Sequence, residues 1–284
     1  MSNSVTSTML RAVSPNGTVA FPQKPRKTYE TVAACLVALV ILVAMGTLKI
    51  SWRDLPQVPG QIWDFLVLMF AHPDWTRLCR ALLEMWRSIS MAWIGAIGTV
   101  VVSLPLGMLA AYGVGPMWLR LGLRGLFAVI RAFPEAVIAI ILLTVTGLTP
   151  FTGALALAIS GIGQQSKWVY ETIESQPNGP AEAVKAAGGS TSEILRWALW
   201  PQAAPSIISF ALYRFEINIR TSAVLGMVGA GGIGAMLSNY TNYREWSVVG
   251  MTLIVVIVST MVVDAISGSI RRRIMEGAKV RAVD

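Results

Sequence analysis

Charged side chains inside apolar segments are the residues of this 284-residue sequence that could act on a solute. Arg131 and Glu135 are four residues apart, and so are Glu216 and Arg220. A spacing of four places both side chains on one face of a helix, so each pair can form an ion pair. An arginine within a membrane costs about 2.5–3.5 kcal/mol on insertion scales and normally faces a partner or a cavity. The planar guanidinium fits a tetrahedral oxyanion, such as phosphate or phosphonate, better than a neutral or cationic solute.

Two interpretations of these charges stay open. The charged residues could line a substrate pathway, or they could form internal salt bridges that only hold a helix bundle together. In the first case Arg214 and Arg220 attract the anion, while Glu135 and Glu216 keep the field from trapping it. The candidate pathway residues are Arg131, Glu135, Arg214, Glu216, Asn218 and Arg220.

A glycine-rich segment invites a different assignment. Gly229, Gly231, Gly232 and Gly234 satisfy the dinucleotide-binding pattern G-x-G-x-x-G. That site needs a preceding strand and an acidic residue about 20 positions later, where this chain is in the apolar run 251–258. We therefore reject NAD binding and expect a flexible or re-entrant turn at the outer mouth of a pore, because irregular backbone is tolerated where it lines a cavity.

No pattern of a catalytic or metal site is present in the sequence. Cys35 and Cys79 are far apart, and the single histidine, His72, precedes a proline in a polar linker. The phosphate-binding pattern G-x-x-x-x-G-K-[ST] is also absent, so any ATP and Mg must be bound by a partner subunit. We predict that the chain is not an enzyme and holds no metal or cofactor of its own.

The composition indicates an integral membrane protein. The chain is 54% hydrophobic and 13% charged, with a mean hydropathy of +0.60, whereas soluble domains carry about 25% charged residues. The net charge of +8 does not form a stripe of the kind that binds nucleic acid. We therefore expect the lipid bilayer, and no nucleic acid, as a partner.

The apolar segments predict an all-α polytopic fold with six transmembrane helices. The expected spans lie within 32–48, 88–119, 121–147, 152–170, 206–227 and 246–263. We divide the chain into a disordered basic tail (1–30), a first transmembrane helix (31–50), an external segment (51–87) with an interfacial helix at 61–70, a transmembrane core (88–270) and a second basic tail (271–284). Lysine and arginine concentrate in one set of connecting segments, which places both termini in the cytoplasm.

A polar segment, 180–205, interrupts the apolar core on the same predicted cytoplasmic side. Good helix formers surround Glu182, and Gly188 and Gly189 break the helix. Ser190, Thr191 or Ser192 can cap the next one. Pro201 and Pro205 are expected to mark the bend back into the membrane. Such an exposed helix pair suits docking in a partner's groove, with an ordinary surface loop as the alternative.

The spacing in this segment resembles the EAA loop of ABC-importer permeases, which sits in a cleft of the ATPase subunit. Glu182 and Ala183 are followed by Gly188 six residues after the glutamate and by Pro201 thirteen residues after that glycine. Three apolar replacements depart from the usual pattern, namely Val184, Ala198 and Trp200. The resemblance implies that the loop at about 176–201 couples this chain to ATP hydrolysis, with Glu182, Ala183, Gly188 and Pro201 as the coupling residues.

Two further stretches resemble phosphonate ABC-importer permeases: residues 213–234 (YRFEINIRTSAVLGMVGAGGIG) and the R-x-x-P-E element that begins at Arg131. The resemblance covers roughly residues 82–273. It implies the type I ABC-importer permease architecture in the bacterial plasma membrane, and a homodimer that works with two ATP-binding cassette subunits and an external substrate-binding protein. The cargo would be phosphonate or a related oxyanion such as phosphate or phosphite.

Other transport classes remain as alternatives. Methionine permeases share the EAA loop and a glycine-rich turn, but the R-F-E-x-N-x-R run favours phosphonates. An ion-coupled secondary transporter would show an inverted repeat, which we do not find. A membrane scaffold or sensor would bind a partner without moving a solute.

Overall fold

The computed structural model describes residues 28–47 and 55–281, and those residues are almost entirely helical. The predicted tail at 1–30 falls mostly outside them. The chain divides into two units, residues 1–61 and 62–284, which are described separately. The first unit contains α2 (Thr28–Thr47), η1 (Leu55–Gln57) and the start of α3 (Val58–Phe70). The side chains of α2 are apolar and exposed, as in Val40 and Leu42, which fits the predicted first transmembrane helix.

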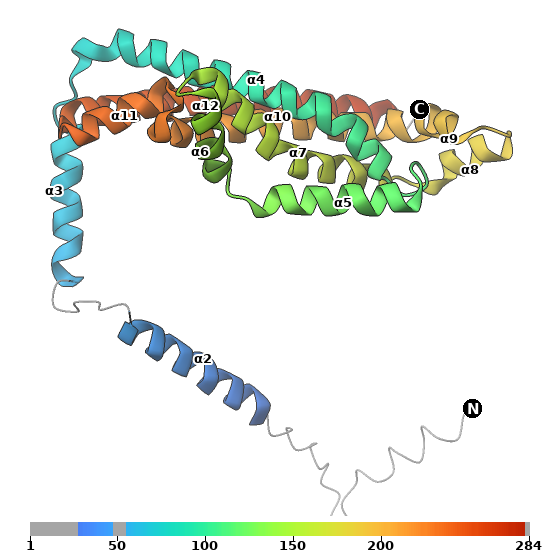
Figure 1. The fold of residues 1–284 in the computed structure, drawn as a ribbon, viewed down its shortest axis with the longest axis horizontal. Coiled ribbons are helices and arrows are strands. Elements are labelled where there is room, and N and C mark those ends of the chain that lie inside the picture. The colour runs from blue at the N-terminus through green and yellow to red at the C-terminus, as the bar shows by residue number, and fades with distance from the viewer. Residues whose placement is uncertain (1–27, 48–54, 282–284) are drawn as a thin grey trace, which may run out of the picture. The chain divides into compact units, whose positions relative to one another are not determined.

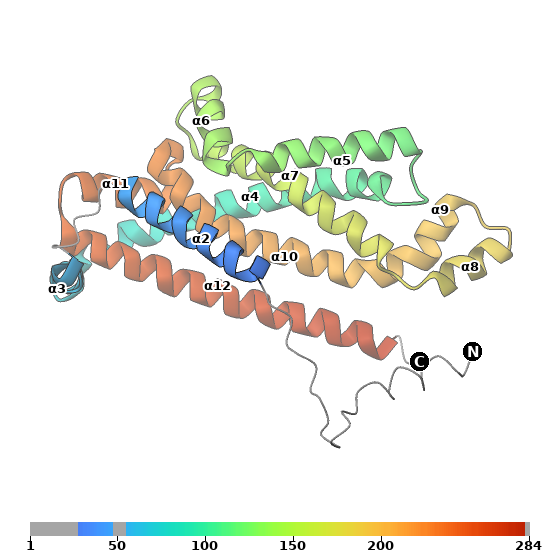
Figure 2. The ribbon, with the colours of Figure 1, turned by 90° about the horizontal axis from the view of Figure 1, so that it is seen from below.

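The second unit is a bundle of long helices (Figure 1). It contains η2 (Trp75–Arg77), α4 (Leu78–Ala110), α5 (Met117–Ala132), α6 (Glu135–Thr146), α7 (Pro150–Glu174), α8 (Asn178–Ala186), α9 (Thr191–Glu193), η3 (Ile194–Leu199), α10 (Trp200–Leu225), η4 (Gly226–Ala230), α11 (Gly232–Asn242) and α12 (Trp246–Arg281). Helix α7 packs against α4, α5, α6 and α10, and α12 packs against α10. Figure 2 shows α8 and α9 at one end of this bundle and α6 near the other.

Close packing of α4 on α7 depends on small residues. A Cβ atom on Gly95 would lie 2.7 Å from Leu157, and one on Gly107 would lie 2.7 Å from Val169. Because lipid provides little hydrophobic drive between helices, such close contacts supply much of the packing energy. Gly95 and Gly107 therefore allow α4 and α7 to approach closely.

Three helices in the described residues are long and apolar enough to cross a membrane: α2, the helix around α4, and α12. The number rises to five if each of two bent pairs counts as one span. Helix α7 lies where the fourth span is predicted, but it is not one of these long apolar helices. The prediction of an all-α protein with several spans is therefore confirmed, whereas the count of six spans is not reproduced.

The third predicted span is two helices rather than one. Helices α5 and α6 meet at an angle of 87°, with extended backbone at Phe133 and Pro134 between them. Proline disfavours helical geometry in the residue before it and cannot donate a backbone hydrogen bond. The break follows from Pro134, which the sequence interpretation had placed inside a single helix.

The bend predicted at Pro201 and Pro205 is wrong. α10 begins at Trp200 and passes through both prolines without ending. The helix irregularity lies just before them, in the π-helical turn η3, whose last N–H bond runs from Trp200 to the Leu195 carbonyl. A wider turn accommodates residues that cannot complete the regular ladder.

A second break follows α10. The turn η4 contains Gly229 at φ 111°, and α11 starts beyond Gly231 at φ 83°, so α10 and α11 meet at 58°. Only glycine adopts such angles without steric cost. The prediction of a glycine turn is confirmed, although its place at an outer mouth stays a prediction.

The predicted interfacial helix at 61–70 corresponds to the latter part of α3. In the second unit, its Phe65 ring meets Trp246 of α12 edge-on at 4.8 Å, and Met69 is buried. Trp63 is largely exposed. One face of α3 therefore packs on the bundle, while its position at a headgroup layer remains a prediction.

Candidate functional site

The polar segment folds as a helical hairpin, residues 178–200, which we call the coupling hairpin after the role that the sequence resemblance predicts for it. Helix α8 ends at a left-handed turn, in which Gly188 has φ +84° and its N–H donates to the Lys185 carbonyl at 3.0 Å. Glu182, Ala183 and Gly188 are all exposed. The predicted helix break and the exposure of these residues are confirmed, so this face is open to a partner.

A capping box starts the second arm of the coupling hairpin. The Ser190 hydroxyl and backbone N–H each donate to the Glu193 carboxylate at 2.7 Å. The box satisfies N–H groups that the first helical turn leaves without partners. Capping by Ser190 is therefore confirmed.

These hydrogen bonds make the start of the helix sensitive to acid. The Ser190 side chain, followed by its backbone N–H, lowers the pKa of Glu193 below its ordinary value of 4.5. A lowered folded-state pKa stabilises the box above the ordinary value, and this contribution disappears as the pH falls through the folded-state pKa. When the pH is lowered below 4.5, we expect residues 191–193 of the parent to lose hydrogen-exchange protection. The same residues of Glu193→Gln should not show this loss. A flat parent profile down to about pH 3 would contradict this assignment.

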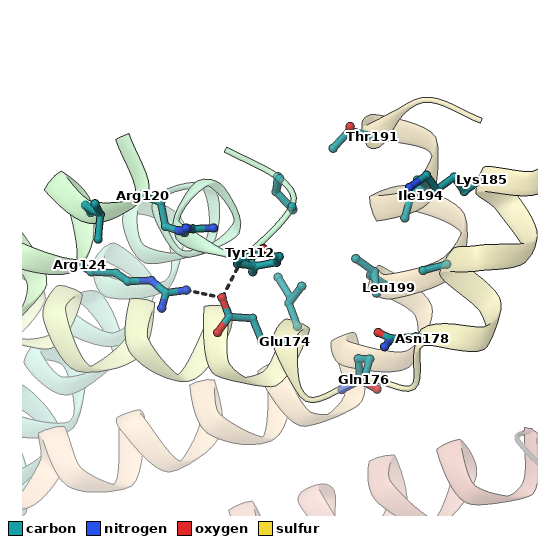
Figure 3. Close-up of a pocket in the computed structure, with 15 residues that line it drawn as sticks. Tyr112, Arg120, Arg124, Glu174, Gln176, Asn178, Lys185, Thr191, Ile194 and Leu199 are labelled. Carbon is teal, nitrogen blue, oxygen red and sulfur yellow. Dashed lines mark hydrogen bonds and ion pairs between the residues drawn. The ribbon is translucent and has the colours of Figure 1, made fainter. Parts of the chain in front are cut away.

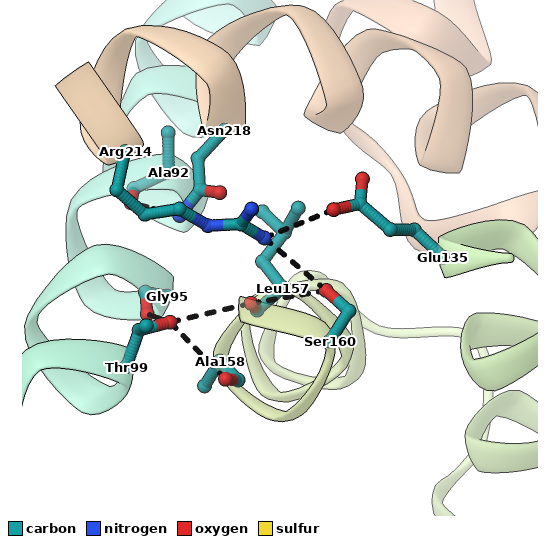
Figure 4. A network of polar contacts seen from close by, with 9 residues as sticks. All are labelled: Ala92, Gly95, Thr99, Glu135, Leu157, Ala158, Ser160, Arg214 and Asn218. Atoms are coloured by element: carbon teal, nitrogen blue, oxygen red, sulfur yellow. Dashed lines mark hydrogen bonds and ion pairs between the residues drawn. The ribbon is translucent and has the colours of Figure 1, made fainter. Parts of the chain in front are cut away.

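The second candidate site is a buried polar network around Arg214 (Figure 4). Its guanidinium donates to the Glu135 carboxylate at 2.9 Å and to the Ser160 hydroxyl at 3.4 Å. The Arg214 side chain is 5% exposed and that of Glu135 is 31% exposed. This pair joins α10 to α6 across α7 and leaves the Glu135 side chain partly accessible.

The two ion pairs predicted at a spacing of four residues are wrong. Arg131 and Glu135 lie on different helices because of the 87° bend, and Arg131 forms no ion pair among the described residues. Glu216 is buried and lies 3.8 Å from Arg271 of α12, whereas Arg220 of the same helix is exposed. Long-range packing, rather than helical spacing, selects the partners.

A pocket lies beside the Arg214 pair. It has a volume of about 360 Å³ and is lined by Glu135 and Ala136 of α6 and by Arg220, Thr221, Val224 and Leu225 of α10. Among these residues, Arg220 is a cation without a carboxylate partner in the described structure, while Glu135 is already paired with Arg214. The pocket can therefore present a net positive charge to a solute.

Asn218 lies in the bundle interior, where it links two helices. It is fully buried, and its amide nitrogen donates to the Ala92 carbonyl of α4 at 3.3 Å. Arg131, Glu216 and Asn218 do not line the pocket that holds Glu135 and Arg220. The six predicted pathway residues are therefore dispersed: Glu135 and Arg220 line this pocket, Arg214 lies in the buried network, Glu216 and Asn218 lie in the bundle interior, and Arg131 is exposed near the end of α5.

The glycine turn is anchored by a residue that the sequence interpretation missed. The backbone N–H of Ile233 donates to the buried Ser88 hydroxyl of α4 at 3.0 Å. A Cβ atom on Gly234 would overlap the backbone of Ala223, so this glycine is needed for the close approach of α11 to α10. Ser160, in the Arg214 network, was missed as well. A serine in an apolar helix carries no signal of its distant partner.

These features define a polytopic membrane protein with an exposed helical hairpin and charged groups within its bundle. Residues 103–276 match the family described as binding-protein-dependent transport system inner membrane component. The match covers more than half of the chain, which therefore belongs to this family of multi-pass inner-membrane permeases.

Individual relatives point in the same direction. HtxC of Stutzerimonas stutzeri, whose name assigns it to phosphite transport, is 31% identical over 252 residues, 88% of this chain and 89% of HtxC. The phosphate-import permease PhnE of Mycolicibacterium smegmatis is 38% identical over 186 residues, which cover 64% of this chain and only 35% of that protein. A solved structure of the MetNI methionine ABC transporter, in an inward-facing conformation, has a TM-score of 0.62 at 20% identity, covering 68% of this chain and 96% of that chain. At this identity the structural likeness concerns the fold alone.

Proposed function

We propose that the chain is the membrane-spanning permease of an ATP-driven importer for phosphonate or a related oxyanion, such as phosphite or phosphate. Family membership supports the permease role. The names of relatives that match most of the chain, or its core, support a phosphorus oxyanion as the cargo. The observation that carries the proposal in this structure is the pocket beside the Arg214–Glu135 pair.

The charge balance of that pocket suits an anion. Arg214 neutralises Glu135 at 2.9 Å, which leaves the positive charge of Arg220 uncompensated at the pocket wall. A guanidinium can donate two parallel hydrogen bonds to a tetrahedral oxyanion. Arg214 itself is too deeply buried to reach a passing solute, so its role in this proposal is to hold and neutralise Glu135.

Partner subunits would supply the energy. Two copies of the chain would work with two ATP-binding cassette subunits and an external binding protein, with the termini and the coupling hairpin in the cytoplasm. The exposed residues Glu182, Ala183 and Gly188 would sit in the ATPase cleft, and Pro201 would begin the helix that carries the movement inward. Closure of the ATPase pair would rock the helices between outward-open and inward-open arrangements. ATP and Mg would bind only to those partner subunits.

Reconstitution of the complete complex tests the proposal. ATP hydrolysis and uptake are measured with the binding protein loaded in turn with phosphite, phosphonate, phosphate or methionine. We expect the phosphorus oxyanions to stimulate both activities. Stimulation by methionine alone would show that the cargo is methionine and not a phosphorus oxyanion. Uptake driven by an ion gradient without an ATPase would show that the chain is a secondary transporter and not part of an ATP-driven importer.

Arg220→Gln isolates the contribution of the pocket cation. A hydrogen bond to a charged group contributes about 1.5–3 kcal/mol, so we expect oxyanion uptake to fall about tenfold or more at equal expression. Arg87→Gln is the matched control, because Arg87 is an exposed arginine paired with Glu84 on α4, outside the pocket. We expect Arg131→Gln to have a smaller effect than Arg220→Gln, since Arg131 does not line the pocket. Parent-level uptake by Arg220→Gln would remove Arg220 from the pathway.

A further inference from the structure

A cluster of contacts lies at the base of the coupling hairpin, away from the substrate pocket (Figure 3). The Arg124 guanidinium of α5 pairs with the Glu174 carboxylate, and Nε and Nη2 donate to the Ala110 carbonyl at 3.1 and 2.9 Å. The Tyr112 backbone N–H donates to the same carboxylate at 2.7 Å, and the guanidinium lies 4.2 Å from the centre of the Tyr170 ring. We call this cluster the Arg124 clamp. It ties together the end of α4, the middle of α5 and the end of α7.

The clamp stands where the coupling hairpin joins the bundle. Glu174 is the last residue of α7, and α8 begins at Asn178. A cavity of about 800 Å³ separates the hairpin from the corner between α4 and α5, with Lys185 and Ile194 on one side and Tyr112 and Arg120 on the other. Among the described residues, no hydrogen bond or ion pair crosses this cavity. The hairpin is attached through the end of α7, the start of α10 and the apolar packing of Leu195 and Leu199 on the cluster around Ala111 and Val169. The clamp is the polar link from that attachment to α5.

Helix α5 leads from the clamp to the substrate pocket. It runs from Met117 to Ala132, and α6 begins shortly afterwards at Glu135, the partner of Arg214. It also lies close against α7, because a Cβ atom on Gly163 would come within 2.7 Å of the Phe127 carbonyl oxygen. A displacement of the α7 end can therefore reach Glu135 through α5 and the short break that joins it to α6.

We propose that Arg124 and Glu174 are positioning residues that transmit movement of the coupling hairpin to α5, and through it to the Glu135–Arg214 pair. This inference rests on the proposed importer function. Both side chains are partly exposed, at 32% and 27%, so the pair acts as a mechanical link that water can reach. Its loss separates ATP hydrolysis from solute movement, whereas a merely structural pair would affect assembly and both activities together.

The test compares uptake per ATP hydrolysed in the reconstituted complex for the parent, Arg124→Gln, Glu174→Gln and the double variant. We expect a fall of about tenfold in this ratio in each single variant, with retained ATPase stimulation and no further fall in the double variant. The matched control is Lys167→Gln with Glu171→Gln, which removes an ion pair contained within α7. Arg124→Lys, which keeps the charge, is expected to recover part of the ratio.

The outcomes separate the two proposals. A parent complex that imports no phosphorus oxyanion counts against the proposed cargo, and the ratio is then measured with whichever solute stimulates its ATPase. A parent-like ratio in both single variants, or an equal loss in the Lys167 and Glu171 control, overturns the inference about the clamp. If a glutamine variant fails to assemble, Arg124→Lys and Glu174→Asp are compared instead, because both substitutions alter the geometry that the link requires. Normal assembly and a parent-like ratio in both of these variants would also overturn the inference about the clamp.

Discussion

Replacement of Gly188 by valine is expected to abolish substrate-stimulated ATP hydrolysis and uptake while leaving the membrane bundle folded. Gly188 has φ +84°, and nothing lies within 4 Å of the position that a Cβ atom would take. The penalty therefore comes from the backbone, since a β-branched residue is strongly disfavoured in the left-handed region. Relief of this strain would redirect the turn between α8 and α9, and so move the exposed face that carries Glu182.

Gly179→Val is the control for that variant. Gly179 lies in the same coupling hairpin and also has open space around it, but its backbone is helical. Its substitution adds the same side chain without left-handed strain, although a β-branched residue before Pro180 is itself somewhat disfavoured in helical backbone. We therefore expect a much smaller loss than in Gly188→Val. ATPase stimulation is measured on both purified complexes, and parent-level stimulation in Gly188→Val would show that the turn geometry is not used in coupling.

The coupling hairpin was predictable because its signals are local. The glycine that ends α8 and the capping box of Ser190 and Glu193 involve residues within a few positions of each other. Turn and cap chemistry depends on such short separations. The π-helical turn at 194–199 had no comparable signal, because it reflects how the continuous helix fits the bundle.

The ion pairs were not predictable because their partners are distant in sequence. Arg214 and Glu135 are 79 residues apart, and Arg124 and Glu174 are 50 residues apart. Helical spacing offered Arg131 as the partner of Glu135, but the break at Pro134 places the two residues on different helices. Pro134 could be read from the sequence, but the sequence interpretation did not infer that a helix break there would separate Arg131 from Glu135.

The second large expected effect is on stability, and it concerns the Arg214–Glu135 pair. Glu135→Leu leaves the 5% exposed guanidinium of Arg214 with Ser160 as its remaining hydrogen-bond partner among the described residues. Breaking a buried ion pair by removing one partner costs about 3–5 kcal/mol, and the partial exposure of Glu135 places this case toward the lower value. We expect a clear fall in the midpoint of thermal unfolding in detergent. Glu171→Leu, at an exposed carboxylate on α7, is expected to change it little.

The double variant Glu135→Leu with Arg214→Met distinguishes the two interpretations of the intramembrane charges. Replacing both members of a buried pair by apolar residues of similar size is often neutral for stability, so we expect the unfolding midpoint to recover toward the parent value. If the pair only holds the bundle together, oxyanion uptake recovers with it. If Glu135 also shapes the pocket beside Arg220, uptake remains low in a stable protein, because the pocket has lost its polar wall opposite that cation. We expect this second result, since Glu135 is the member of the pair that lines the pocket.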